Sequence, residues 1–525
     1  MFLRQVAGNL LKRLGFPSRH AYSASGITNN ASRSRKIEIS NWHGSGAYSW
    51  RIDPRDPRLW VVICGNIAMI LGINANPVFA KEASTEASSD NDTERADIIG
   101  LRKIEDGSIV SNIHTSKWRV FTDKGREFFL QGKLDEAEKL FLAALEEAKE
   151  GFGKRDPHVA SACNNLAELY RVKRAFEKAE PLYNEALDIL KESYGYEDIR
   201  VGTTAHNVGQ FFLGQRKLKE ARGFYEIALK IKRRALGYVH LDCADTMYHL
   251  GVVLYLQGQE MDGMALIQDS IKMLEELGEG ESFECVRRLR YLSQIYTKSH
   301  NLAEAEMIQR KILHVMELSK GWDSLDTVIA AEALALTLLA SCNFKDAQDL
   351  LERCLKTRKA LLPGDHIQIG ANMLHLARLA LNSRLLNSSD VSRAEAELDK
   401  AKDHLQNSIR IARQFLDKSL KQNNKSKNYS PPRHSGKEGR AALVILLQSL
   451  NTMASLELAK QELLGTQEGH INHNAEEALL QCISAYKEFP SKSIADAPEV
   501  KNEYLSCLKH VESLLGDKFH ERTKQ

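Results

Sequence analysis

The chain has 525 residues, of which 43% are hydrophobic and 27% charged, and its formal net charge is +3. This composition is ordinary for a soluble globular protein and leaves ample length for a large core. The positive charge is concentrated at the start, because residues 1–58 hold ten Lys and Arg against three acidic residues. The remainder lacks the broad basic face that nucleic-acid binding requires, so we expect no nucleic-acid partner.

Residues 1–58 have the features of a targeting leader. The first 36 residues contain seven Lys and Arg and no acidic residue, and their apolar side chains fall on one helical face. An amphipathic, Arg-rich and acid-free start is typical of a mitochondrial presequence, which the inner-membrane potential draws inward. A chloroplast transit peptide and an untargeted disordered tail are the alternatives. We therefore predict a mitochondrial protein, with a cytoplasmic one as the alternative, and a disordered leader that lies outside the folded domain.

Residues 59–80 form a hydrophobic segment. Its apolar part, Leu59–Ile73, is shorter than the roughly 20 residues of a membrane-spanning helix. Three arginines precede it and the acid-rich stretch 82–97 follows, which by the positive-inside rule places its N-terminal side in the matrix. The segment is either an inner-membrane anchor or sorting signal toward the intermembrane space, or a helix that extends the presequence or packs on the first repeat. Residues 81–112 are polar without periodicity and predict a linker.

From residue 113 to residue 418 one pattern returns every 42 residues, and we count seven copies. Within each copy, apolar residues before and after a central small residue form two stripes of helical period, with a short polar turn such as 131–133 between them. The sequence predicts an all-α solenoid of stacked antiparallel helix pairs. In copy four the small residue is a glycine, which inside a helix costs roughly 1 kcal/mol relative to alanine. The small residues are Ala137, Ala179, Ala221, Gly263, Ala305 and Ala347.

At these residues the chain resembles the tetratricopeptide repeat family, and the resemblance implies a right-handed superhelix. The 42-residue period, the turn at 153–159 and the run 164–170 are similar to the kinesin light chain subclass. The heptad coiled coil that precedes the repeats in true light chains is missing from residues 1–112, which argues against a motor subunit. The matching residues are Gly125, Phe128, Ala137, Phe141 and Ala144 in copy one, Leu166, Ala167, Tyr170, Ala179, Tyr183 and Ala186 in copy two, and Gly209, Phe212, Ala221, Tyr225 and Ala228 in copy three.

The C-terminal part departs from the regular repeat. The seventh copy begins near Gly370 and carries a twelve-residue insertion, because its small residue reappears late, as Ala401. Residues 419–440 are basic and rich in helix breakers, which predicts a disordered loop. Residues 441–525 predict a degenerate eighth helix pair and a capping helix that covers the last open apolar face. These helices are expected at 441–464, 475–489 and 499–515.

The sequence shows no catalytic or metal-binding motif. The eight cysteines are scattered without a C-x-x-C pair, and we expect most of them to be buried thiols. The stretch 151–154 lacks the first glycine and the Ser or Thr of a phosphate-binding loop. We therefore expect neither an enzyme nor a bound cofactor or metal.

The family resemblance implies a concave groove lined by the first helix of each pair. Asparagines there can donate to and accept from a peptide backbone at once, and Arg126 and Arg290 can pair with acidic side chains of a ligand. Each residue has the alternative role of bonding only a neighbouring helix. Carried across from the family, the candidate partner-binding residues are Arg126, Asn164, Asn165, Glu168, His206, Asn207, Gln210, Tyr248, Arg287, Arg290 and Gln294.

Two functional hypotheses follow from these features. The first is a non-enzymatic mitochondrial adaptor or assembly factor that binds an extended peptide or a partner helix in the groove, with inner-membrane association through residues 59–73. The second is a cytosolic adaptor related to kinesin light chain, in which the first 80 residues are a disordered tail. The sequence leaves the identity of the partner and the oligomeric state open.

Overall fold

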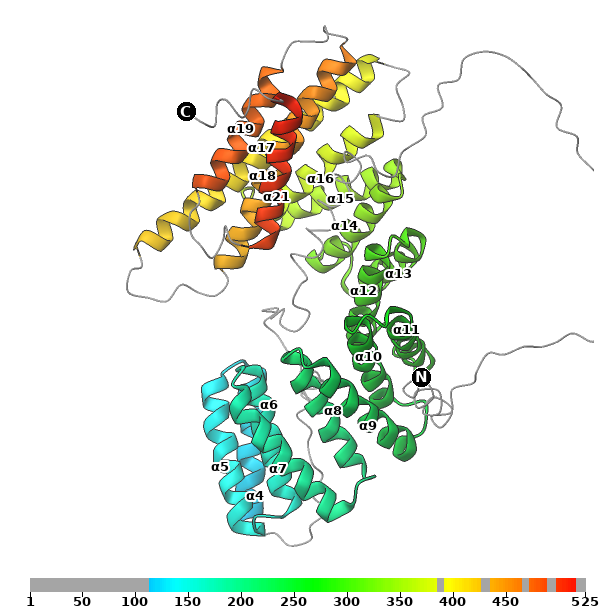
Figure 1. The fold of residues 1–525 in the computed structure, drawn as a ribbon, viewed down its shortest axis with the longest axis vertical. Coiled ribbons are helices and arrows are strands. Elements are labelled where there is room, and N and C mark those ends of the chain that lie inside the picture. Colours follow the sequence, from blue (N-terminus) through cyan, green and yellow to red (C-terminus); the bar gives the residue numbers. More distant parts are fainter. Residues whose placement is uncertain (1–112, 385–390, 426–434, 465–471, 489–496, 516–525) are drawn as a thin grey trace, which may run out of the picture. The chain divides into compact units, whose positions relative to one another are not determined.

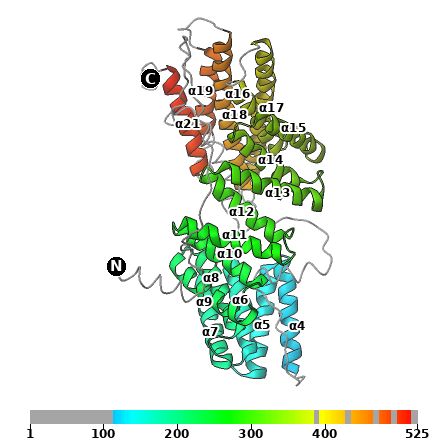
Figure 2. The same ribbon diagram turned by 90° about the vertical axis from the view of Figure 1, so that its right-hand side faces the viewer.

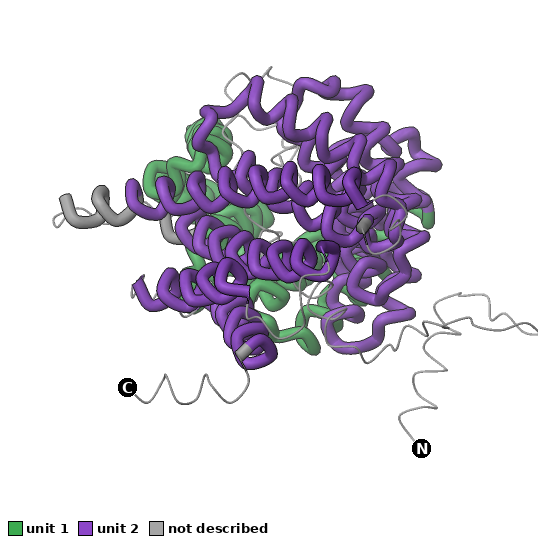
Figure 3. Tube along the Cα trace, turned by 90° about the horizontal axis from the view of Figure 1, so that it is seen from above, with its two compact units in different colours: residues 1–56, 96–238 green, residues 57–95, 239–525 purple. Residues whose placement is uncertain are grey.

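The structure, a computed structural model, describes residues 113–384, 391–425, 435–464, 472–488 and 497–515 (Figure 1). The described chain divides into two compact units, which end and begin at the bond between Tyr238 and Val239 (Figure 3). All regular secondary structure in the described ranges is α-helical, so the predicted all-α class is confirmed. The predicted leader, hydrophobic segment and linker fall within residues 1–112 and lie outside the described residues.

Unit 1 consists of three consecutive helix pairs, as the repeat predicts. In each pair the small residue of the second helix is fully buried against the first helix, with a large aromatic residue beside it. The aromatic residues are Phe141, Tyr183 and Tyr225, each at most 1% exposed. The helices are α4 (Ile113–Leu130), α5 (Leu134–Phe152), α6 (Pro157–Val172), α7 (Phe176–Tyr194), α8 (Ile199–Gly214) and α9 (Leu218–Leu236).

The turn inside each pair repeats with the same 42-residue period. The first helix ends in a residue of left-handed conformation, and the next amide donates back to a carbonyl five residues earlier, as in the bond from Lys133 N to Phe128 O of 2.9 Å. This is the Schellman arrangement, which satisfies carbonyls that the helix end would leave unpaired. It confirms the predicted polar turns. The left-handed residues are Gly132, Arg174, Arg216, Gly258, His300 and Cys342, with φ between 59° and 84°.

The start of each first helix also repeats, which sequence reasoning missed. A polar side chain precedes the helix and accepts a backbone N–H two or three residues later, as Asp198 Oδ1 does from Arg200 N at 2.8 Å. Such caps pair one of the four free N–H groups at a helix start. The residue type changes along the chain while the position does not, which is why the pattern escaped notice. The capping residues are Asp156, Asp198, His240, Ser282, Ser324 and His366.

Unit 2 continues with helix pairs of the same kind and a continuous apolar core (Figure 2). The small residues Ala305 and Ala347 are fully buried at their predicted places. The helices of these regular pairs are α10 (Leu241–Leu256), α11 (Glu260–Glu276), α12 (Phe283–Lys298), α13 (Leu302–Lys320), α14 (Leu325–Ala340) and α15 (Phe344–Leu361).

The fourth pair shows why Gly263 replaces an alanine. A Cβ added at Gly263 would lie 2.7 Å from the carbonyl oxygen of Gly251 and 2.7 Å from the amide nitrogen of Tyr255. The backbones of α10 and α11 therefore approach too closely for any side chain at this position. The expected helix-propensity cost of the glycine is thus outweighed by packing, because alanine would clash with backbone that cannot give way.

The seventh pair consists of α16 (Ile367–Arg384) and the long α17 (Val391–Lys425). Ala401 is 1% exposed and Leu405 fully buried, so the late small residue occupies the expected core position. Helix α17 runs to Lys425 and α18 begins at Ser435. Helix therefore covers residues 419–425 and 435–440 of the predicted disordered loop, and its centre, 426–434, lies outside the described residues.

Three further helices follow in the C-terminal part of the described chain. They are α18 (Ser435–Leu463), α19 (His473–Glu488) and α21 (Pro498–Leu515), and α21 packs on both α18 and α19. Within the described ranges, one stretch, 438–463 of α18, has the length and apolarity of a membrane span. Most of it is buried among neighbouring helices, which is what a core helix of a helical bundle also shows.

Candidate functional site

The eleven candidate residues lie where the repeat places them, on the first helix of successive pairs. Those on α4, α6 and α8 belong to unit 1, and those on α10 and α12 belong to unit 2. Their exposure divides them sharply. Arg126, Asn165, Glu168, His206, Asn207 and Tyr248 are buried, at most 7% exposed, while Asn164, Gln210, Arg287, Arg290 and Gln294 are half-buried.

In unit 1 an amide pair joins α6 to α8. The Nδ2 of Asn207 donates to the Oδ1 of Asn164 at 3.0 Å. Asn164 remains half-buried, whereas Asn207 is 2% exposed. We call the surface formed by the first helix of each pair the first-helix face. On this face the buried Asn207 holds the half-buried Asn164 in place. The amide of Asn164 can bond a backbone N–H or C=O of a peptide.

The carboxylate of Glu168 has a different role. It is fully buried and accepts from Arg171 Nε at 2.9 Å and from the hydroxyl of Tyr183. Burial, followed by the charge of this carboxylate, raises the pKa of Tyr183 well above its usual value. Glu168 therefore fixes the packing of α6 against α7, and the sequence-based interpretation of it as a partner contact loses its basis, because its oxygens already have donors inside the pair.

His206 and Asn165 complete the unit 1 face. The Nε2 of His206 lies 2.9 Å from the Nε2 of Gln210, and the ring meets that of Tyr225 edge-on at 5.3 Å. Asn165 is 1% exposed, and its Nδ2 has no hydrogen-bond partner among the described residues. Gln210 is thus the half-buried end of this group, while His206 and Asn165 lie beneath the surface.

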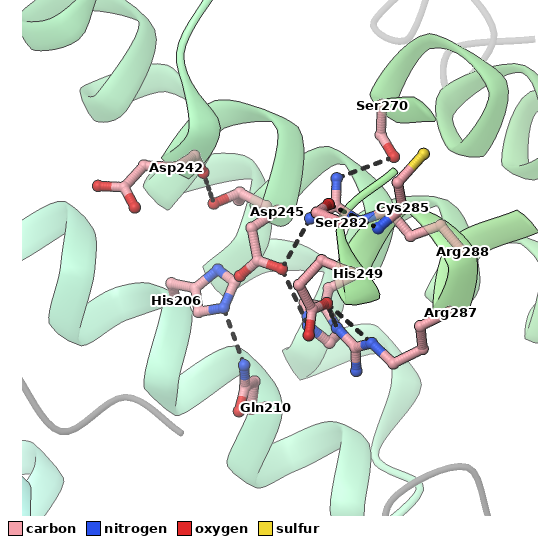
Figure 4. Close-up of polar contacts among 12 residues, drawn as sticks. His206, Gln210, Asp242, Asp245, His249, Ser270, Ser282, Cys285, Arg287 and Arg288 are labelled. Carbon is pink, nitrogen blue, oxygen red and sulfur yellow. Dashed lines mark hydrogen bonds and ion pairs between the residues drawn. The ribbon is translucent and has the colours of Figure 1, made fainter. Parts of the chain in front are cut away.

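In unit 2 the candidate Arg287 and its neighbour Arg288 are both paired with carboxylates (Figure 4). Arg287 Nε donates to Glu284 Oε2 at 2.8 Å, and Arg288 donates to Asp245 Oδ1 at 3.3 Å. Both guanidinium groups lie over the ring of Tyr248, 5.4 and 5.3 Å from its centre. Sequence reasoning chose Arg287 and missed Arg288, which is 2% exposed and whose pKa is lowered by burial. The sequence does not show which acidic residue an inward-facing arginine will pair with, so it could not reveal the contact between Arg288 and Asp245.

Arg290 differs from its neighbours. Its guanidinium contacts the sulfur of Met316 at 3.8 Å and meets no carboxylate among the described residues. Gln294, one turn later on α12, is half-buried. Tyr291 lies beside them, with its ring centre 6.1 Å from that of Tyr248, and burial raises its pKa. Half-buried donors beside an aromatic wall can accept an acidic or amide-bearing side chain.

A group of metal-ligand residue types also occurs in unit 1, at His114, Glu147 and Glu150. The oxygens of Glu147 are engaged, one by His114 Nδ1 at 2.8 Å and the other by Lys117 Nζ at 3.0 Å. These donors lower the pKa of Glu147, Lys117 first and His114 second. The arrangement is a surface ion pair network rather than a set of free ligands.

Comparison with known families agrees with the repeat. The tetratricopeptide repeat family model matches residues 127–192, 200–276 and 285–360. No curated protein sequence matches the chain.

Several solved structures are similar to this chain at low identity. The TPR-like repeats of a Podosopora anserina protein described as a kinesin light chain are 16% identical and cover 39% of this chain and 98% of their own, with a TM-score of 0.36. Apo RapI is 12% identical, covers 77% and 99%, and has a TM-score of 0.48. The apo quorum sensor NprR from B. thuringiensis is 12% identical, covers 82% and 99%, and has a TM-score of 0.40.

Proposed function

We propose that this chain of tetratricopeptide repeats is a non-enzymatic scaffold, a mitochondrial adaptor or assembly factor that binds an extended peptide or a partner helix along its first-helix face. Tetratricopeptide repeat domains in general bind protein or peptide partners, and the family model that matches this chain is of that kind. The observation that carries the proposal is the amide pair Asn164–Asn207, in which a buried asparagine holds a half-buried one at the surface.

The amide pair suits peptide binding because exchanging hydrogen-bond partners costs little. A peptide amide that bonds Asn164 replaces a bond to water with an equivalent one, so the net gain is about 0.5–1.5 kcal/mol per bond. Several such bonds along the face hold a backbone without selecting its sequence. Gln210 offers the next amide, on α8.

Arg290 adds selectivity within unit 2. A half-buried guanidinium with no carboxylate partner among the described residues gains a charge-assisted bond when a ligand brings an acidic side chain. We therefore refine the candidate residues from eleven to the half-buried ones other than Arg287, whose guanidinium is already held by Glu284. Asn164 and Gln210 bind backbone, and Arg290 and Gln294 bind side chains of the partner.

The proposal places the protein in mitochondria on the basis of the leader sequence. The acid-free, Arg-rich start supports import, and the apolar stretch 59–73 supports attachment to the inner membrane. The cytosolic alternative, an adaptor related to kinesin light chain, retains the same repeats and differs in the fate of the leader. Protease treatment of isolated mitochondria, before and after rupture of the outer membrane, separates these locations.

Site-specific photo-crosslinking tests the face itself. We expect a crosslinker at Gln294, or at Asn164, to capture a defined partner in mitochondria, while one at exposed Asn184 on α7 or exposed Arg310 on α13 captures none. Arg290→Ala should weaken capture at position 294, whereas Arg310→Ala should leave it unchanged. Equal capture at the first-helix positions and at those on α7 and α13, or capture only on α7 and α13, would show that the partner does not bind the first-helix face.

A further inference from the structure

The last two helices of unit 2 are joined by a covalent bond. Cys482 on α19 and Cys507 on α21 form a disulfide, with their Cα atoms 6.4 Å apart. The pair is 25 residues apart in sequence, on two different helices. The sequence predicted that most cysteines are buried thiols; these two are buried but bonded to each other. The free described cysteines are Cys163, Cys243, Cys285, Cys342 and Cys354, of which Cys342 is exposed.

Both sulfurs are closed off from solvent in the folded unit. Cys482 and Cys507 are fully buried, and each Sγ faces the carbonyl oxygen of Leu447 on α18, at 3.6 and 3.9 Å. The stacked rings of Tyr486 and Tyr504, with centres 4.1 Å apart, bridge the same two helices. No oxidant can reach either sulfur while α21 is docked in this way.

We propose that Cys482 and Cys507 are a site of thiol–disulfide exchange with an external disulfide, used while α21 is undocked, and that the resulting bond closes the C-terminal cap. In the first step one cysteine thiolate attacks the external disulfide, forming a mixed disulfide and releasing one external thiol. In the second step the other cysteine thiolate attacks the protein sulfur of that mixed disulfide and releases the second external thiol. Two cysteine thiols are oxidised and one external disulfide is reduced to two thiols.

The closed bond determines how firmly the cap is held. Helix α21 packs chiefly on α18 and α19, and its polar contacts with α18 are made by Glu503, which accepts from Gln448 at 2.7 Å, and by Ser506 and His510, which both contact Asn451. Removing the crosslink frees the chain entropy that the bond suppresses in the open state, so the reduced cap should open more often. Disulfides persist in oxidising compartments, so the bond also favours maturation outside the reducing cytosol and matrix.

Thiol counting tests the bond directly. The purified full chain is denatured without reductant and treated with iodoacetamide, then compared with a sample that is reduced first. We expect two fewer modified cysteines without reductant, mapped by mass spectrometry to Cys482 and Cys507, with Cys354 as a buried free control and Cys342 as an exposed one. Modification of both residues without reductant would overturn the proposal.

Exchange and cap opening are tested on the same protein. Reduced, unfolded chain is refolded with oxidised glutathione alone or with an added oxidised protein disulfide. If the bond forms with oxidised glutathione alone, the external disulfide is a small molecule. If it forms only with the protein disulfide, the source is an oxidoreductase. If it forms with neither, exchange is refuted. Hydrogen exchange of residues 498–515 is read in Cys507→Ser, in Cys482→Ser and in the control Cys342→Ser, because serine keeps a side chain of similar size at each position. We expect exchange at least tenfold faster than in the unmodified chain for Cys507→Ser and Cys482→Ser, and an unchanged rate for Cys342→Ser. An unchanged rate in all three variants refutes a closing role.

Discussion

His375 on α16 should make the stability of unit 2 depend on pH. The side chain is 2% exposed, and its Nδ1 has no hydrogen-bond partner among the described residues. Burial lowers the pKa of His375 to about 4; Glu332 opposes this, and Arg378 and Arg358 add to it. The imidazole is therefore held neutral in the folded chain at every pH above about 4.

The direction of the effect follows from the unfolded state, in which a histidine has a pKa near 6.5. Because the folded pKa is the lower one, the stability is fully present above pH 6.5 and is lost as pH falls toward 4. Each pKa unit corresponds to about 1.4 kcal/mol, so the loss amounts to about 2 kcal/mol between pH 7.5 and pH 5 and about 3 kcal/mol below pH 4. Burial also lowers the pKa of His366 and His404, which act in the same direction, and raises that of Glu503, which acts in the opposite one.

The comparison that isolates His375 uses native-state hydrogen exchange of the α16 amides, corrected for the intrinsic pH dependence of exchange. We expect the free energy of opening in the unmodified chain to fall by about 2 kcal/mol more than in His375→Gln between pH 7.5 and pH 5. His314→Gln, an exposed residue of α13, should keep the full pH dependence. Equal slopes for His375→Gln and the unmodified chain would refute the account, since the other titrating groups are common to both.

Two substitution pairs test the packing and capping arguments. Gly263→Ala should destabilise unit 2 by about 1–3 kcal/mol, because its Cβ would meet the backbone of α10. Gly223→Ala in α9, where a Cβ meets nothing within 4 Å, should stabilise unit 1 by up to about 1 kcal/mol. Hydrogen exchange of the two units measures both effects, and a stabilising Gly263→Ala would contradict the close approach of α10 and α11. Ser324→Ala should cost about 1 kcal/mol because it removes the acceptor of the Asp326 N–H at 3.3 Å, whereas exposed Ser193→Ala should change little; equal melting temperatures for the two variants would show that the cap contributes nothing.

The fold could be predicted from the sequence because a close approach of two helices demands a particular residue size. Ala137 and Ala305 are fully buried at 42-residue multiples, so the small residue alone locates both helices of a pair. The turns and caps repeat with the same period. A turn requires a residue in the left-handed conformation and a cap requires a side-chain acceptor atom, and several residue types supply each. Arg174 and Cys342 hold the same left-handed turn as Gly132, and no reading by residue type would align them.

The candidate site was harder to predict because the period gives a position and not its neighbours. Glu168 and Gln210 are equivalent positions of consecutive repeats, yet Glu168 is fully buried and Gln210 half-buried. The difference lies three residues further on, where Arg171 covers Glu168 and copy three has Leu213 instead. The carboxylate of Glu168 forms an ion pair with Arg171, which covers it. The amide of Gln210 is neutral, and the residue three positions on is a leucine, so it forms no such pair.

The same reasoning explains which residues of the first-helix face remain available to a partner. Acidic residues in this fold find arginines within the chain, as Glu332 does in Arg358, so a carboxylate at a groove position tends to become structure. Arg290 meets no carboxylate among the described residues. In the proposed site, pairing inside the scaffold thus takes Glu168 and Arg287 from the candidate residues and leaves three amides and Arg290. We expect that residue set to favour a partner which brings its own carboxylate over a basic one.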